Sequence, residues 1–396
     1  MKSKFLGMGV AVASLVAASL AAAAPAADAA AGGRHAERVC AASSSPTVAS
    51  CYSKVMVNGK GVVPRSTTPA ASAMTPAQLK SAYNLNGTSS GGRTVAIVDA
   101  YGYPNLASDL ATYRSYYGLP ACTTANGCLK IMDQNGGTNL PRMDVGWAGE
   151  QALDVDAVSA ICPDCKIIVV QASSASIANL GTAVNTASKQ AGVVAISNSY
   201  GGGDLSDATY GANYNHPGIA VTASTGDNGY QGGSFPSSSQ YVTAVGGTTL
   251  APASNSRGWS ESAWSGAGSG CSTVNPALAA AASSGTGCSM RAIADVSAAA
   301  DPNQGGMAVY YPTSRNASTW AQVGGTSESA PIIASVYALS GNTSGYANAK
   351  PYANTGALFD VTAGSNGSCP TTQWCNARSG WDGPTGLGSP NGTGAF

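Results

Sequence analysis

The stretch Thr94–Ala100, which reads TVAIVDA, is a continuous apolar run. A run of this length without polar–apolar alternation is typical of a strand that is buried on both faces in a parallel sheet. A second run of the same kind, KIIVVQA, spans Lys166–Ala172. Parallel strands need a long connection between them, and helices usually provide it. The two runs therefore predict an α/β fold.

The residues on either side of these two runs continue the alternation of strands and helices. Further strands are predicted at Val193–Ser199, Ile219–Ser224 and Tyr241–Val245, and helices at about residues 75–85, 104–117, 149–161 and 177–190. This order predicts a mostly parallel sheet with helices on both faces and right-handed crossovers. In such sheets, functional residues gather at the carboxyl ends of the strands.

The composition excludes several classes of protein. The chain has 396 residues, with 19 basic and 19 acidic side chains, and only 10% of its residues are charged. A balanced charge argues against a surface that follows phosphates, so nucleic acid is not an expected partner. A hydrophobic content of 44% argues against a disordered chain.

The N-terminus has the pattern of a secretory signal peptide, predicted at residues 1–29. Lys2 and Lys4 precede an apolar stretch over residues 5–24, and Ala27–Ala29 fits an A-x-A cleavage site. No later stretch has the roughly 18 apolar residues of a membrane helix, so we expect a secreted protein without a membrane anchor. Residues 30–73, rich in Ala, Ser, Pro and Thr, are interpreted as an N-terminal extension or linker, and residues 74–396 as the main domain.

The ten cysteines fall in close pairs along the chain, which is typical of disulfides in an exported protein. The predicted pairs are Cys40–Cys51, Cys122–Cys128, Cys162–Cys165, Cys271–Cys288 and Cys369–Cys375. Two alternatives are a redox CxxC at Cys162–Cys165 and a zinc site. The redox motif usually occurs in another strand–helix context, and the two histidines, His35 and His216, lack finger-like spacing.

Ser327 is the candidate nucleophile. It follows Gly324 and Gly325 and precedes an apolar helical run at Ile332–Leu339, so its hydroxyl is expected near the backbone N–H groups of a helix start. The alternative is an ordinary N-cap serine. A nucleophilic serine needs a base. Neither histidine has the surroundings of a catalytic one, so a Ser-His-Asp triad is excluded.

Two acids could replace histidine as the base. Glu150 and Asp154 are four residues apart and so share one face of a helix. Their neighbours are largely apolar, and like charges in such surroundings are relieved when the pair shares a proton. The alternative is a solvated acidic face.

Asp227 is the third candidate. It lies in the segment Ser224–Gly229, STGDNG, directly after a predicted strand, so its carboxyl is expected at the carboxyl edge of the sheet. The alternative is a plain turn, since Asp and Gly are common turn residues.

Together these segments resemble the sedolisins, the serine-carboxyl peptidases, and the order of the motifs agrees from about Met74 to the C-terminus. The matching motifs are Glu150-x-x-Leu153-Asp154, Ser197–Gly202 (SNSYGG), Ser224–Asp227 (STGD), Gly325–Pro331 (GTSESAP), Asp360–Thr362 (DVT) and Gly380–Asp382 (GWD). Support also comes from Trp259–Trp264 (WSESAW) and Asp295–Ala298 (DVSA).

The resemblance implies a subtilisin-like fold and a secreted serine endopeptidase. Ser327 would attack the peptide carbonyl, Glu150 would act as general base and then acid, and Asp154 would orient Glu150. Asp227 would stabilise the oxyanion, which requires it to be protonated, so we expect an optimum in acid. The extended backbone at Ser199, Tyr200 and Gly201 would bind peptide or protein substrates.

The resemblance also implies one structural calcium ion near the C-terminus. Its ligands would be the carboxylates of Asp360 and Asp382 and the carbonyls of Val361, Arg378 and Gly380. Oxygen ligands on a turn-rich loop suit calcium. The alternative is a surface loop pinned by its disulfide.

The chain departs from the family upstream of the peptidase domain. Sedolisins usually carry a folded pro-domain of well over a hundred residues, whereas only about 45 residues separate the predicted signal peptide from Thr75. A second hypothesis is therefore a catalytically silent secreted binding protein on a peptidase-like scaffold. We expect a monomer.

Overall fold

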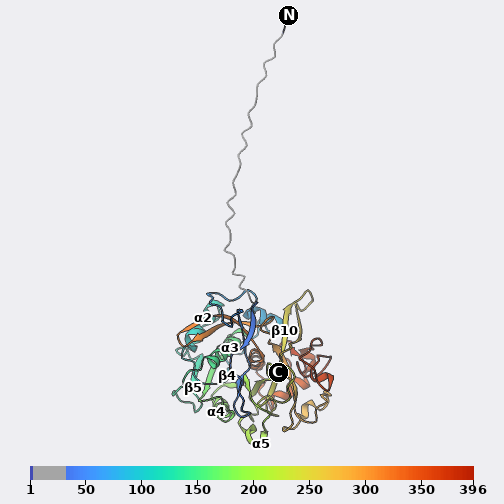
Figure 1. Cartoon of the computed structure of the whole chain (residues 1–396). Coiled ribbons are helices and arrows are strands. Elements are labelled where there is room, and N and C mark those ends of the chain that lie inside the picture. The colour runs from blue at the N-terminus through green and yellow to red at the C-terminus, as the bar shows by residue number, and fades with distance from the viewer. Residues whose placement is uncertain (3–32) are drawn as a thin grey trace.

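The computed structural model describes residues 1–2 and 33–396, so the apolar core and cleavage site of the predicted signal peptide lie outside the described residues. The main sheet has eight strands (Figure 1). Their order across the sheet is β11 (Trp259–Ala263), β10 (Thr243–Pro252), β9 (Ala220–Ser224), β7 (Val193–Asn198), β4 (Thr94–Ala100), β6 (Lys166–Ala172) and β5 (Leu129–Asp133), with β14 (Val296–Ala299) beside β10.

The pairing in this sheet is mostly parallel. Strand β4 pairs with β6 in continuous parallel register, from Thr94 opposite Lys166 to Ala100 opposite Ala172. Strands β7, β9 and β10 extend the sheet in the same direction, and β11 alone runs antiparallel to its neighbour β10. Every residue of β4 is buried, as expected for a strand that is covered on both faces.

Helices cover the two faces of the sheet, which confirms the predicted α/β class. Val95 and Ile97 of β4 belong to one apolar core and Ala96 and Val98 to the other, because successive side chains point to opposite faces. The first core contains residues of α1 (Pro76–Ala82), α2 (Leu106–Tyr116), α3 (Val145–Ile161) and α6 (Thr326–Ser340), and the second contains residues of α4 (Ile177–Ser188).

Helices α3 and α6 are the most deeply buried helices of the fold. They pack against each other, α6 also contacts β7 and β9, and α3 also contacts β15 (Met307–Ser314). Strand β15 belongs to a second, antiparallel sheet in the order β1 (His35–Arg38), β3 (Lys54–Val57), β16 (Ala317–Gly324) and β15. Strand β16 leads directly into α6, so this sheet fixes the position at which α6 begins.

The remaining strands and α-helices of the described residues are short. They are β2 (Ser50–Cys51), β8 (Tyr200–Gly201), β12 (Gly270–Cys271), β13 (Ala292–Ile293), β17 (Leu358–Phe359), β18 (Ser389–Pro390), α5 (Asp207–Tyr210) and α7 (Lys350–Ala353).

The segment interpreted from sequence as an extension or linker contributes the three strands β1, β2 and β3. Strand β3 pairs with β16, and β2 pairs with β8, which follows β7 of the main sheet. In Figure 1 the blue ribbon of this segment runs between the green and the orange parts of the chain. Residues 35–57 are thus joined by backbone hydrogen bonds to two parts of the main domain, β16 and β8.

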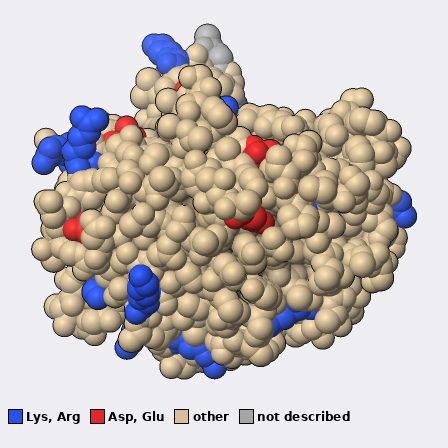
Figure 2. Space-filling model, turned by 90° about the horizontal axis from the view of Figure 1, so that it is seen from below, with Lys and Arg blue, Asp and Glu red and all other residues tan. Residues whose placement is uncertain are grey.

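The five predicted cysteine pairs are confirmed as disulfides, and Cys162–Cys165 is one of them. Figure 2 shows a face made mostly of uncharged residues, with scattered basic side chains near its edge. Within the described residues, no helix combines the length and apolar character needed to cross a membrane.

Candidate active site

Ser327 lies in the first turn of α6, where β16 ends and the helix begins. Gly325 precedes the helix with a φ of 107°, a left-handed conformation that favours glycine. The Ser327 side chain is fully buried. Its Oγ donates a hydrogen bond to the carbonyl of Ser199 at 3.0 Å and accepts one from the backbone N–H of Tyr52 at 3.1 Å.

Glu150 reaches this site from α3, and its carboxyl group is completely buried. One oxygen, Oε2, accepts a hydrogen bond from the hydroxyl of Ser53, while Oε1 has no hydrogen-bond partner among the described residues. Burial raises the pKa of Glu150 well above its usual value, and the charge of Asp99 raises it further. Hydrogen bonds from the hydroxyls of Ser327 and Ser53 lower the pKa of Glu150 and so oppose part of this rise.

Asp154 lies one turn further along α3 and is also fully buried. Its Oδ1 accepts a hydrogen bond from the hydroxyl of Ser199 at 2.8 Å. Burial raises the pKa of Asp154 well above its usual value, and the charges of Asp99 and Glu150 raise it further. Within the described residues Asp154 has no hydrogen bond to Glu150, so the two acids interact through their charges and through their shared neighbours.

Asp99 joins the acidic group from the end of β4, and sequence reasoning missed it. Both of its carboxyl oxygens are buried without a hydrogen-bond partner in the described part of the chain. Burial raises its pKa to about 8. The available signal was an acidic residue near the carboxyl end of an otherwise apolar parallel strand, which is where functional side chains gather.

Asp227 approaches Ser327 from the loop after β9. Its Oδ1 accepts hydrogen bonds from the Thr326 backbone N–H at 2.8 Å and from the Thr326 hydroxyl at 2.9 Å, while Oδ2 has no partner among the described residues. Burial raises the pKa of Asp227 to about 6, against the lowering effect of Thr326 and of the Lys54 charge. This carboxyl is therefore protonated in mildly acidic solution.

The predicted substrate edge is formed by Ser199 and by Tyr200 and Gly201 of β8. The Tyr200 side chain points away into the core, where its hydroxyl donates to Asn198 Oδ1 at 2.8 Å. The backbone of this edge is paired with β2, with Ser50 opposite Gly201 and Cys51 opposite Tyr200. The edge thus binds an extended peptide strand, which comes from the chain itself.

The histidines lie elsewhere. His35 in β1 contacts Glu37, and the ring of His216 contacts the carbonyl of Asn213. The structure therefore places Ser327, Glu150, Asp154 and Asp227 in one site, and neither described histidine contacts the Ser327 hydroxyl.

The predicted calcium ligands form a separate group. Asp382 is buried and accepts from the backbone N–H of Arg378 at 3.1 Å, and Asp360 accepts from the N–H of Gly380 at 3.0 Å. Burial raises the pKa of Asp382 to about 7, and the charge of Asp360 adds to the rise. Two carboxyl groups that influence each other through their charges, on a turn-rich loop, are suitable oxygen ligands for a hard cation, so these residues fit calcium.

Another cluster of metal-ligand types consists of Cys40, Cys51 and Glu150, whose ligand atoms lie within 4.8 Å of one another. The two sulfur atoms are bonded to each other in a disulfide, so they are not available as thiolate ligands. This cluster is not a metal site.

Comparison with known proteins gives one relative that spans most of the chain. Kumamolisin from Bacillus sp. (strain MN-32) is 32% identical over 368 residues, which cover 83% of this chain and 64% of the relative. Tripeptidyl-peptidase SED1 from Arthroderma otae is 40% identical over 98 residues, which cover 23% of this chain and 14% of the relative. The chain spans less than two thirds of the length of these curated relatives. No family model matches the chain.

Solved structures share the fold. Pseudomonas sedolisin, a serine-carboxyl proteinase complexed with two molecules of pseudo-iodotyrostatin, superposes with a TM-score of 0.67 at 24% identity, covering 81% of this chain and 96% of that chain. The S41 psychrophilic protease superposes with a TM-score of 0.54 at 17% identity, covering 81% and 99%.

Proposed function

The chain belongs to the sedolisin family, and from this premise we propose that it is a serine-carboxyl endopeptidase that hydrolyses peptide bonds through an acyl-enzyme on Ser327. One observation carries the proposal. The Ser327 hydroxyl, the unpartnered Oε1 of the buried Glu150 and the unpartnered Oδ2 of the buried Asp227 belong to one site that contains no imidazole.

In the proposed reaction Ser327 Oγ attacks the substrate carbonyl while its proton passes to Glu150. The carbonyl oxygen becomes an oxyanion, which accepts hydrogen bonds from the Ser327 backbone N–H and from protonated Asp227. Glu150 then gives its proton to the leaving amine, and a water molecule hydrolyses the ester by the same steps. Asp154 accepts a hydrogen bond from Ser199 and so holds this residue at the substrate edge, and the charge of the nearby Glu150 helps to raise the pKa of Asp154.

The reaction needs acid because Asp227 can donate a hydrogen bond only when it is protonated. Its pKa of about 6 supports a protonated carboxyl in mildly acidic solution. An ionised carboxylate would repel the oxyanion, whereas one well-placed donor lowers the barrier by roughly 3–4 kcal/mol. We therefore place the optimum below about pH 6.

The test is digestion of a denatured protein in acid by the wild-type chain and by Ser327→Ala. We expect the substitution to abolish digestion. The matched control is Ser335→Ala, which removes a buried hydroxyl from the same helix that donates only to the carbonyl of Pro331. Digestion that survives in Ser327→Ala contradicts the proposal. Inactivity of all three proteins supports the alternative of a silent binding protein.

The same proposal includes one calcium ion. Asp360 and Asp382 would hold it with the carbonyls of Val361, Arg378 and Gly380, and the ion would fix the loop that carries them. The ion would stabilise the fold and would take no part in catalysis, since the acids beside Ser327 are not among its ligands.

We further propose that the protein is exported and acts outside the cell. The signal-peptide pattern at residues 1–29 supports this, and so do the five disulfides, because such bonds form and persist in oxidising compartments.

A further inference from the structure

The chain's own residues 49–54 show where an extended peptide lies in the cleft beside Ser327. Strand β2 pairs antiparallel with β8, and the N–H of Tyr52 donates to the carbonyl of Ser199 at 3.2 Å. The carbonyl of Tyr52 accepts a hydrogen bond at 3.0 Å from the Ser327 backbone N–H, which is a donor that the proposed reaction assigns to the oxyanion. The Tyr52 carbonyl therefore marks the position of the carbonyl group that Ser327 attacks in a substrate.

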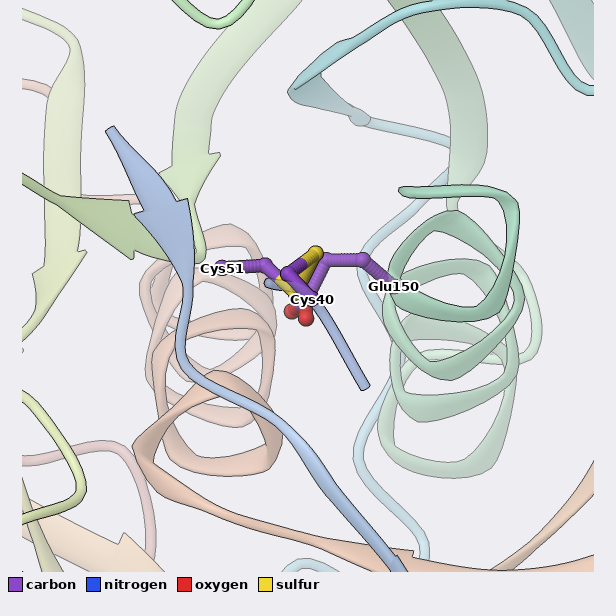
Figure 3. Close-up of side chains that lie close together, drawn as sticks. All are labelled: Cys40, Cys51 and Glu150. Atoms are coloured by element: carbon purple, nitrogen blue, oxygen red, sulfur yellow. A yellow bond between two sulfur atoms is a disulfide. The ribbon is translucent and has the colours of Figure 1, made fainter. Parts of the chain in front are cut away.

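A disulfide fixes the residue before Tyr52. Cys51 is bonded to Cys40, and their sulfur atoms lie within 4.8 Å of a carboxyl oxygen of Glu150. Figure 3 shows this disulfide beside the Glu150 carboxyl, which reaches from helix α3. The segment is thus anchored at the site on the side that precedes the Tyr52 carbonyl.

The backbone that follows Tyr52 is paired as well. Lys54 lies opposite Gly324 in the antiparallel pairing of β3 with β16, and Gly324 is three residues before Ser327. Lys54 is also the second residue after the Tyr52 carbonyl. A substrate in the same register would therefore place there the second residue after its cleaved bond, which belongs to the product that leaves as the amine.

The Lys54 side chain enters a recess beside the site. Its ammonium group donates a hydrogen bond to the carbonyl of Asp227 at 2.7 Å and lies 5.2 Å from the centre of the Trp264 ring. A cation over an aromatic ring is attracted by the negative face of the ring, and tryptophan gives the strongest attraction of this kind. The recess has a volume of about 430 Å³, and its lining includes Asn228, Pro302 and Asn303.

The ring of Trp264 is held in place by the surrounding fold. The side chain is buried and packs with Ala267 and Ala300, and its backbone N–H donates to the carbonyl of Gly247 at 3.1 Å. A Cβ atom on Gly266 would stand 2.4 Å from the ring, so a larger residue at position 266 would displace it. The aromatic wall of the recess is therefore formed before a ligand binds, which lowers the entropic cost of binding.

The chemistry of the recess suits a positively charged side chain. The aromatic face and the carbonyl oxygen of Asp227 both attract a cation, whereas a carboxylate in this place would meet the negative face of the ring and no hydrogen-bond donor from a basic residue. Apart from Lys54 itself, no basic side chain among the described residues lines the recess. An arginine side chain also fits this chemistry, because its planar guanidinium group stacks on aromatic rings and donates to carbonyl oxygens.

We propose that this recess is a specificity pocket for a lysine or arginine side chain two residues beyond the cleaved bond, an inference that rests on the proposed peptidase function. A substrate strand that takes the place of residues 49–54 sets its basic side chain against Trp264 and the carbonyl of Asp227. These contacts form when the substrate binds and persist in the transition state, so they lower KM more than they raise kcat. The substrate class is an unfolded protein or peptide with a basic residue at this position.

The first experiment digests a denatured protein with the full chain at about pH 4 and identifies the cut bonds by mass spectrometry. We expect lysine and arginine to be enriched at the second position after the cuts, relative to their frequency in the digested protein. Defined peptides that differ only at this position, with Lys, Leu or Glu, then give the size of the effect. We expect kcat/KM for the Lys peptide to exceed that for the Leu peptide about fivefold, chiefly through KM, and the Glu peptide to be the poorest substrate.

Variants of the tryptophan assign the preference to the recess. Trp264→Leu is expected to bring the ratio of kcat/KM for the Lys and Leu peptides close to one, and Trp264→Phe is expected to give an intermediate ratio. The matched control is Trp320→Phe, which changes a tryptophan in a different aromatic cluster, with Tyr113 and Tyr116, and should keep the wild-type ratio. Because each ratio compares two peptides on one protein, a general loss of activity cancels.

The outcomes separate this inference from the proposed function. Digestion without enrichment of basic residues at this position, or equal kcat/KM for the Lys and Leu peptides, overturns the pocket and leaves the peptidase proposal standing. A wild-type ratio in the folded Trp264→Leu protein also overturns the pocket. If this variant does not fold, as judged by its melting temperature, Trp264→Phe decides, and a wild-type ratio there contradicts the inference. The absence of any digestion overturns both proposals.

Discussion

Asp227 is the residue whose chemistry differs most from that of a histidine-based serine peptidase. Its Oδ1 is fixed by Thr326, and among the described residues Oδ2 has no hydrogen-bond partner. The carboxyl can stabilise an oxyanion only as a neutral acid, and burial raises its pKa to about 6 although the charges of Lys54 and Arg38 act to lower it.

Replacement of Asp227 by Ala is therefore expected to lower kcat by about 10²–10³-fold, because one oxyanion donor is lost. Asp227→Asn keeps an acceptor for Thr326 and a donor at the other branch, so it should retain more activity than the Ala variant. The measurement is steady-state hydrolysis at acidic pH. An Ala variant with wild-type kcat would show that Asp227 does not contact the oxyanion.

A second prediction concerns Asp99 and the pH dependence of the stability of the folded chain. Its pKa is raised from 3.8 to about 8 on folding, so the folded chain holds a proton that the unfolded chain loses. The stability from this group is fully present below about pH 4 and is lost as the pH rises towards about 8. In a Ser327→Ala background, adding Asp99→Asn should make the melting temperature fall less steeply between these pH values. Parallel curves for the two proteins would contradict the shift.

At the level of elements, the apolar strands were the most predictable part of the fold. The bounds of β4 and β6 agree with the apolar runs TVAIVDA and KIIVVQA because strands buried on both faces must be apolar throughout. The hairpin of β15 and β16 was not predicted. Its partners include Val55 of β3, which is far away in sequence, and such pairing leaves no local pattern.

The candidate site likewise has a part that could be predicted from sequence and a part that could not. Ser327, Glu150 and Asp227 lie in local motifs at helix starts and strand ends, so the sequence could indicate them. The place of Tyr52 in the cleft depends on contacts with residues more than a hundred positions away, such as Ser234 and Ser327, and no spacing within residues 30–73 reveals it.

At the level of elements, the testable prediction concerns the loop between Asp360 and Asp382 and its proposed calcium ion. Calcium that binds only the folded chain stabilises it, so chelation should lower the melting temperature of the Ser327→Ala protein by about 5 °C. Asp382→Asn removes one charged ligand while keeping an oxygen for Thr385, and its melting temperature should not respond to added calcium. An unchanged melting temperature after chelation of the parent protein contradicts the calcium site.

At the scale of the whole molecule, two helices, one strand, one loop and one N-terminal segment all contribute residues to a single site. The acids come from α3, β4 and the loop after β9, the serine from α6, and the peptide strand that fills the cleft from residues 49–53. Burial of four acids together is unfavourable when all are ionised, so the assembly is suited to solution in which most of them hold protons.

The pH dependence of peptide hydrolysis tests the central claim most directly, because it asks whether carboxyl groups do the work of imidazole. With denatured protein as the substrate and kcat/KM measured from about pH 3 to about pH 8, the account predicts a maximum in acid and a loss of activity as the pH rises through about 6, where Asp227 ionises. A rate that instead climbs from about pH 6 to about pH 8 would contradict it.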